Sequence, residues 1–171
     1  MMRIICKDEI EMRCKRLLIG FLGLIEGFLI VGLVKKYQSR KEREQRKKVD
    51  KLQAHYDLLN HWLEVKNENK GIASYFEDMG YSHIAVYGMA ELGNRLIEDL
   101  KGSSICVDYG IDRDVCCSIA GIAEVYFPED ELPKTDAIVV TPYSAFEAIK
   151  KQLEQRVDCP IISLEDIVWS V

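Results

Sequence analysis

Histidine is scarce in this chain and confined to its first half. Only three of the 171 residues are histidine, namely His55, His61 and His83, and no Cys-x-x-Cys pair accompanies them. The ligand spacing that structural zinc sites require is therefore absent, and the sequence predicts no metal site. Because no histidine follows His83, the second half also lacks the side chain that most often acts as a general base.

Several catalytic motifs are missing as well. The chain has no Gly-x-Ser-x-Gly nucleophile turn and no Gly-x-x-x-x-Gly-Lys-Ser/Thr phosphate loop. A short-chain dehydrogenase would need a Tyr-x-x-x-Lys pair after its fourth strand, but Glu147 stands four residues after Tyr143. These absences favour a binding function over catalysis.

The six cysteines form no recognisable framework. Cys116 and Cys117 are adjacent, and neighbouring cysteines rarely bond to each other because the geometry is strained. We therefore expect reduced thiols, as in a cytosolic domain.

The charge is divided unevenly along the chain. Residues 1–50 carry 13 Lys and Arg against 7 Asp and Glu, whereas residues 51–171 carry 10 against 21. This asymmetry predicts two physically different parts. The acidic part is a poor partner for nucleic acid, which is bound by clustered cations, so no nucleic-acid ligand is expected.

Residues 17–34, LLIGFLGLIEGFLIVGLV, form a long apolar run with one charge, Glu26. As a helix the run would be about 27 Å long, enough for the hydrocarbon core of a bilayer, so it predicts a transmembrane helix after a short tail, residues 1–16. Lys35 and Lys36 follow it in place of a signal-peptide cleavage site. Eight Lys and Arg between residues 35 and 48, against five before the run, predict a single-pass cell-membrane protein whose C-terminal domain is cytoplasmic.

Two features of the first third predict contact between copies of the chain. Gly23 and Gly27 have the Gly-x-x-x-Gly spacing that lets helices approach closely, although Glu26 between them is equally explained as a lone neutral carboxyl. Residues 35–69 predict a basic helical stalk, in which residues 49–63 carry an apolar heptad stripe. We expect this stripe to pack on the following domain or to pair with a second chain. The stripe consists of Val49, Leu52, Tyr56, Leu59 and Leu63.

Residues 70–171 alternate short apolar runs with amphipathic stretches, the pattern of a parallel sheet covered by helices. Strands are expected at 83–87, 104–111, 123–127, 137–141 and 161–162. Helices are expected at 71–79, 91–100 and 144–155 and after a cap at Ser163, with a partly helical connection at 113–120 and a loop at 128–136. Right-handed crossovers leave few topologies. The predicted fold class is α/β, a Rossmann-like three-layer fold with a short parallel sheet of about five strands.

The stretch IAVYGMAELGNRLIEDL, residues 84–100, contains an altered dinucleotide fingerprint. It reads Gly-x-Ala-x-x-Gly, with Gly88, Ala90 and Gly93 at the three glycine positions. Gly88 permits the tight turn and Gly93 permits close helix–strand packing, whereas Ala90 adds a methyl where backbone approaches a pyrophosphate. Free amides at the helix start favour an anion, but the Glu91 carboxylate competes for them.

Further ligand contacts are expected at the ends of later strands. Asp108 has the spacing of the acid that binds ribose hydroxyls, but Asp112, at the end of its strand, is better placed. The hydroxyl of Thr141 could contact a sugar, whereas Ser144 is more simply explained as a helix cap. The predicted cofactor-binding residues are Gly88, Met89, Ala90, Glu91, Gly93, Asp112 and Thr141. The alternative is that the glycines only build the turn of a ligand-free fold.

Four segments carry a resemblance to a known group of domains: IAVYGMAELGNRLIEDL, ICVDYGIDRD, LPKTDAIVVTP and CPIISLEDIV. Residues 70–171 resemble the small Rossmann-like, nucleoside-diphosphate-sugar epimerase-like domains of bacterial capsule and exopolysaccharide proteins. They are also similar to the nucleotide-sugar-binding N-terminal domain of bacterial sugar O-acyltransferases. The resemblance implies NAD(P) or a nucleotide sugar over Gly88, Ala90 and Gly93, with Asp112 at the second strand. It also implies partner proteins of polysaccharide biosynthesis.

The chain departs from both groups in ways that bear on activity. It lacks the hexapeptide repeats of the acyltransferases and the Tyr/Lys pair and substrate domain of the epimerases. We therefore expect a membrane-anchored cytoplasmic module that binds a nucleotide or nucleotide sugar without catalysing a reaction. Two alternatives stay open: an NAD(P)-dependent, epimerase- or oxidoreductase-like subunit that needs a partner chain for catalysis, and a ligand-free scaffold.

Overall fold

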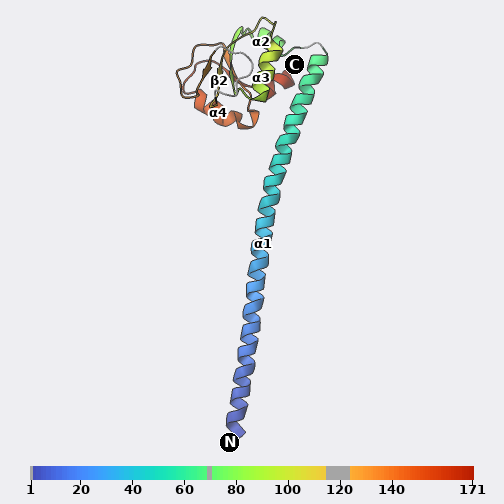
Figure 1. Ribbon diagram of the computed structural model, residues 1–171, viewed down its shortest axis with the longest axis vertical. Helices are drawn as coiled ribbons and strands as arrows, with labels where there is room; N and C mark the ends of the chain where they lie inside the picture. Colours follow the sequence, from blue (N-terminus) through green and yellow to red (C-terminus); the bar gives the residue numbers. More distant parts are fainter. Residues whose placement is uncertain (1, 69–70, 115–123) are drawn as a thin grey trace. The chain divides into compact units, whose positions relative to one another are not determined.

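The computed structural model describes residues 2–68, 71–114 and 124–171, and it describes side chains from residue 32 onward within these ranges. The chain divides into two compact units, Met1–Leu52 and Gln53–Val171. A single helix, α1 (Met2–Asn67), forms the first unit and continues into the second (Figure 1).

The backbone of the expected membrane span is helical throughout, and that of the expected stalk is helical as far as Asn67, because both belong to α1. In the part of the chain described with side chains, no helix combines the length and the apolar character needed to cross a bilayer. Most of the run 17–34 lies outside that part, and so do the side chain of Glu26 and the positions Gly23 and Gly27.

The second unit contains a five-stranded sheet with the order β3-β2-β1-β4-β5, in which all neighbouring strands are parallel. The strands are β1 (His83–Tyr87), β2 (Cys106–Ile111), β3 (Val125–Tyr126), β4 (Ala137–Val140) and β5 (Ile161–Ser163). The chain proceeds from β1 to β2 and β3 on one side and then crosses to β4 and β5 on the other. The connections therefore diverge between β1 and β4, at the switch point where doubly wound sheets bind ligands.

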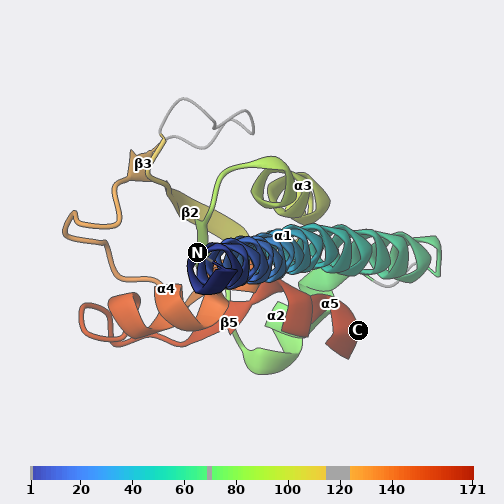
Figure 2. The ribbon, with the colours of Figure 1, turned by 90° about the horizontal axis from the view of Figure 1, so that it is seen from below.

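Helices cover both faces of the sheet, which confirms the α/β prediction. One face carries α2 (Ile72–Met79), α3 (Glu91–Leu100), α5 (Leu164–Ser170) and the end of α1, and the other carries α4 (Phe146–Leu153). Figure 2 shows α3 and α4 on opposite sides of the strands. Successive residues of β1 enter the two cores in turn, as side chains of a strand alternate between faces. All four residues of β4 are buried, as expected for a strand covered on both sides.

Most expected elements are present, with shifts of a few residues at their ends. The prediction that Ser144 caps a helix is wrong. Pro142 instead begins a short 3₁₀ turn, η2 (Tyr143–Ala145), so that α4 starts after Ala145. Ser163 does occupy the N-cap position of α5, but its side chain makes no capping hydrogen bond. Most of the connection expected at 113–120, and the start of the strand expected at 123, lie outside the described residues.

The end of α1 packs on the domain through a face other than the apolar stripe. The buried residues are Leu58, Trp62 and Val65. Only Leu59 of the stripe is packed against the core, and its other members are 59–69 % exposed. The expectation that the stripe packs on the domain is therefore wrong for Tyr56 and Leu63, which belong to the same unit as the sheet, and pairing with a second chain stays a prediction.

A polar contact accompanies this apolar burial at the end of α1. Trp62 belongs to the buried row Leu58, Trp62 and Val65. Its indole Nε1 donates a hydrogen bond to the Asp99 carboxylate of α3. Two apolar rows with spacings of three and four residues lie side by side on this helix, so periodicity alone does not distinguish them.

Candidate functional site

The segment after β1 is a tight turn that carries the altered fingerprint. Gly88 has a φ of +92°, in the left-handed region that favours glycine, and its N–H donates to the Ile111 carbonyl at 2.8 Å. A Cβ added to Gly93 would lie 2.1 Å from the Gly88 carbonyl oxygen, so α3 meets the turn with no room for a methyl. These two glycines therefore serve the turn and the helix packing, the functions of the first and third glycines in a dinucleotide fingerprint.

Two of the predicted contact residues are turned into the protein. The Met89 side chain is fully buried and packs against Gly110, where an added Cβ would lie 2.7 Å from the Met89 sulfur. The Thr141 hydroxyl is shared between the carbonyls of Gly88, at 2.8 Å, and Tyr87, at 3.2 Å. Both side chains therefore stabilise the turn from within and do not line the space outside it.

Asp112 holds the same turn from the end of β2. Its Oδ2 accepts the Met89 N–H at 2.6 Å, and its Oδ1 accepts the Asp114 N–H at 2.9 Å. Hydrogen bonds from backbone amides to a carboxylate are about twice as strong as neutral ones. Asp112 is thus a positioning residue for the turn, and it also lines the cavity beside it.

A cavity of about 430 Å³ opens at the carboxyl edge of the sheet, between the ends of β1 and β4. Gly88 and Ala90 line it from the turn, and Pro142 lines it from the end of β4. Its volume lies within the roughly 300–1,000 Å³ of typical ligand sites. The remaining lining residues are Tyr87, Asp112, Arg113, Ala145, Ala148, Ile149 and Gln152.

The polar lining of this cavity offers both donors and acceptors. Burial is the largest effect and raises the pKa of Tyr87 above its ordinary value, while the charge of the nearby Arg113 guanidinium lowers that pKa in part. Tyr87 is therefore a neutral phenol at neutral pH, able to donate its own hydrogen beside a cation and the carboxylate of Asp112.

The amino end of α3 adds to the donor side of the cavity. Ala90 is its N-cap residue and supplies no side-chain cap, so the first-turn amides are not satisfied by that residue. Glu91, which was expected to compete with an anion, has its carboxylate 2.9 Å from the Arg95 guanidinium, one turn further along the helix.

A larger hollow of about 850 Å³ lies at the opposite, amino edge of the sheet, but its charge is unsuited to an anion. Its lining includes five carboxylates, from Glu129, Asp130, Glu131, Asp136 and Asp158. The guanidinium of Arg156 donates to the carbonyls of Pro128, Glu129 and Asp130. Arg156 therefore holds the loop before β4, and together with Lys134 it offsets only two of the five negative charges.

The sequence identified part of the cavity and missed its cation. Gly88, Ala90 and Asp112 line it as expected, whereas Asp108 lies near the start of β2 and pairs with His83 at 2.8 Å. Arg113 was missed although a signal was present, because it follows Asp112 directly and the ends of parallel strands meet at one edge. Comparison of the chain with protein-family models, with curated proteins and with solved structures finds no match.

Proposed function

We propose that the domain binds a phosphate-bearing nucleotide, such as NAD(P) or a nucleotide sugar, in the cavity between the ends of β1 and β4. The observation that carries this proposal is the meeting of Arg113 with the glycine turn at the switch point of a parallel sheet. A guanidinium presents several N–H donors to phosphate oxygens, and the open amino end of a helix favours an anion.

The lining fits the two chemical parts of such a ligand. Arg113, Tyr87 and the amides near Ala90 are donors for a diphosphate, whereas Asp112 is an acceptor for sugar hydroxyls. The added methyl of Ala90 is exposed, so it narrows the approach to the backbone without filling the cavity. Two neighbouring side chains that could block the cavity do not do so, since Met89 is buried in the core and Glu91 is paired with Arg95.

Binding without catalysis is the better-supported form of the proposal. Among the described residues, the lining contains no histidine, cysteine or lysine. Its one carboxylate, from Asp112, already accepts two backbone N–H groups. The groups that remain can bind and orient a ligand, but they include no free base to take a proton from it.

We further propose, from the sequence, that the chain is anchored by residues 17–34 in the cell membrane, with the domain in the cytoplasm near proteins that assemble surface polysaccharide. The apolar run and the basic flank support the anchor, and the resemblance of residues 70–171 supports the setting. Reporter fusions at both ends test the orientation, because only a cytoplasmic C-terminus would leave an export-dependent reporter inactive there.

Calorimetric titration of the full-length chain in detergent with NAD, NADP and uridine-diphosphate sugars tests the binding site. Replacing Arg113 by Gln removes a charged hydrogen-bond donor, worth about 1.5–3 kcal/mol, and should weaken binding about 10- to 100-fold. Arg43→Gln is the matched control, because Arg43 is an exposed arginine of α1 outside the cavity. Ala90→Asp should abolish binding without lowering the melting temperature, because Asp is favoured at the N-cap position that Ala90 occupies.

If the domain is a ligand-free scaffold, these titrations should give a different result. In that case none of these ligands should release or absorb heat of binding at millimolar concentration, or the wild type, Arg113→Gln and Ala90→Asp should bind with equal affinity. Either outcome would remove the nucleotide proposal.

A further inference from the structure

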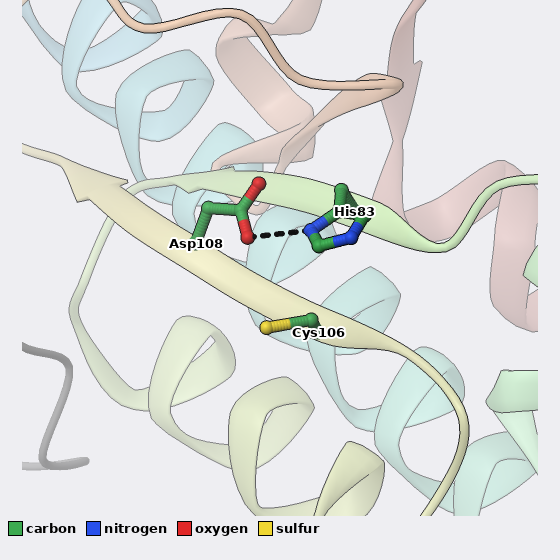
Figure 3. Close-up of side chains that lie close together, drawn as sticks. All are labelled: His83, Cys106 and Asp108. Atoms are coloured by element: carbon green, nitrogen blue, oxygen red, sulfur yellow. Dashed lines mark hydrogen bonds and ion pairs between the residues drawn. The ribbon is translucent and has the colours of Figure 1, made fainter.

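A separate group of polar side chains lies at the start of β1, away from the cavity. His83 begins β1, Cys106 begins the neighbouring strand β2, and Asp108 follows two residues later (Figure 3). Each offers one potential ligand atom: an imidazole nitrogen, a thiol sulfur and a carboxylate oxygen. These three atoms lie within 4.8 Å of one another, and no other group of three or more such side chains occurs in the part of the chain searched.

The register of the two strands brings these residues together. His83 and Cys106 are directly paired across the parallel ladder. The register then shifts between Ile84 and Ala85, so that Asp108 has no partner of its own on β1. Irregularities of this kind re-aim a side chain next to a site. Here Asp108 turns back toward His83, and their nitrogen and oxygen atoms are 2.8 Å apart.

The backbone around the group is held by hydrogen bonds. The His83 N–H donates to the Asp136 carboxylate at 2.8 Å, and the His83 carbonyl accepts the Thr135 hydroxyl at 2.8 Å. The Cys106 N–H donates to the Ser82 carbonyl at 2.8 Å. Two ligand-bearing strands with fixed backbones provide the rigid support that metal sites require, and the Asp136 carboxylate adds negative charge near a bound cation.

We propose that His83, Cys106 and Asp108 bind a divalent transition-metal ion of the zinc class. Nitrogen, sulfur and oxygen are all ligands of Zn²⁺ and Co²⁺. Three protein ligands leave one tetrahedral position for water, an arrangement typical of zinc sites that interact with a substrate.

The geometry requires only local adjustment. The bond lengths of zinc sites set ligand-to-ligand distances of roughly 3.3–3.8 Å. Ligand atoms up to 4.8 Å apart must therefore close by about 1.0–1.5 Å, and the His83 and Asp108 atoms, now 2.8 Å apart, must open by about 0.5 Å. His83 and Cys106 are exposed, which allows their rotamers to change without moving the core.

Titration of the reduced full-length chain with Co²⁺ tests the proposal, because a tetrahedral cobalt–thiolate site has a charge-transfer band in the near ultraviolet. Cys106→Ser should lose this band. His83→Gln and Asp108→Asn should weaken cobalt binding by more than the about 10- to 100-fold that loss of a second-shell hydrogen bond causes. Cys159→Ser and the double substitution Cys116→Ser, Cys117→Ser are controls that should keep the band.

A second measurement needs no variant. Zn²⁺ should displace the cobalt and slow alkylation of Cys106 relative to Cys159, as followed by mass spectrometry of the peptides. The proposal is overturned if the wild type has no charge-transfer band, if Cys106→Ser keeps it, or if only the Cys116/Cys117 substitution removes it. Equal alkylation of Cys106 with and without Zn²⁺ would overturn it as well.

Discussion

The Asp99 carboxylate accepts a hydrogen bond from the Trp62 indole at 3.1 Å, although 37 positions separate the two residues in the chain. The same carboxylate lies 2.6 Å from the Lys66 ammonium. Asp99 is largely buried at the end of α3, whereas Lys66 is mostly exposed. The Asp99 carboxylate therefore links the end of α1 to α3. Its hydrogen bond from Trp62 is better shielded from solvent than its ion pair with Lys66.

Replacing Asp99 by Ala should lower the free energy of unfolding by about 1–3 kcal/mol, because the buried Trp62 N–H loses its acceptor. Tryptophan fluorescence should shift to the red as that indole becomes hydrated. Lys66→Ala is the control and should cost less than about 1 kcal/mol, as exposed ion pairs do. Equal losses of unfolding free energy for the two variants, measured by urea unfolding, would contradict a larger contribution from the indole hydrogen bond.

Gly93→Ala should destabilise the domain by about 2–3 kcal/mol or more, because the new methyl meets the Gly88 carbonyl and neither backbone segment can move easily. Gly71→Ala is a matched control. Its methyl would have no neighbour closer than 3.9 Å, and the change should cost less than about 1 kcal/mol. Thermal unfolding of the two variants measures the difference, and an unchanged melting temperature for Gly93→Ala would show that the turn can relax.

Thr141→Val keeps the shape of a buried side chain and removes the hydroxyl that bonds to the Gly88 and Tyr87 carbonyls. We expect a loss of about 1–2 kcal/mol in unfolding free energy. Ser144→Ala, at an exposed position of η2, should change stability by less than about 0.5 kcal/mol. If Thr141→Val instead weakens nucleotide binding with stability unchanged, the hydroxyl contacts ligand, as the sequence first indicated.

Alkaline titration should reveal one phenol with an unusually high pKa, that of Tyr109. Burial, the largest cause, raises the pKa of Tyr109 from 10.0 to about 12, and its hydroxyl donates to the Pro133 carbonyl at 2.7 Å. Because the folded-state pKa is raised, the stabilisation is fully present below the unfolded pKa of 10.0 and is lost as pH rises through about 12.

The tyrosinate absorbance lost in Tyr109→Phe relative to the wild type isolates this group from the other tyrosines. That difference should titrate with a midpoint near 12. A midpoint at the ordinary value, measured while circular dichroism shows a folded chain, would mean that the phenol is hydrated.

Local patterns were enough to predict the strands and helices of the domain. The apolar run HIAVY gave the bounds of β1, and the glycines beside it marked the turn, because both signals depend on residues a few positions apart. The helix after β4 was placed too early, since the preference of Ser144 for a cap yielded to the tight turn begun by Pro142.

Contacts between distant segments could not be predicted in the same way. His83, Cys106 and Asp108 have no metal-binding spacing, and only the strand pairing and its register shift bring them together. Trp62 and Leu58 were passed over because a parallel apolar row on the same helix has equally regular spacing. In each case the deciding contact is tertiary, so a pattern within one element does not contain it.

The hydrogen bond from Thr141 to the Gly88 carbonyl joins the two chain segments between which the cavity opens. The Thr141 N–H also donates to the Tyr87 carbonyl at 3.0 Å, so a main-chain bond and a side-chain bond together hold these two segments. The opposite wall is lined by the small residues Ala145 and Ala148, close to and within α4. A bulkier residue at Ala148 would therefore narrow the cavity from the side of α4 while the sheet stays intact.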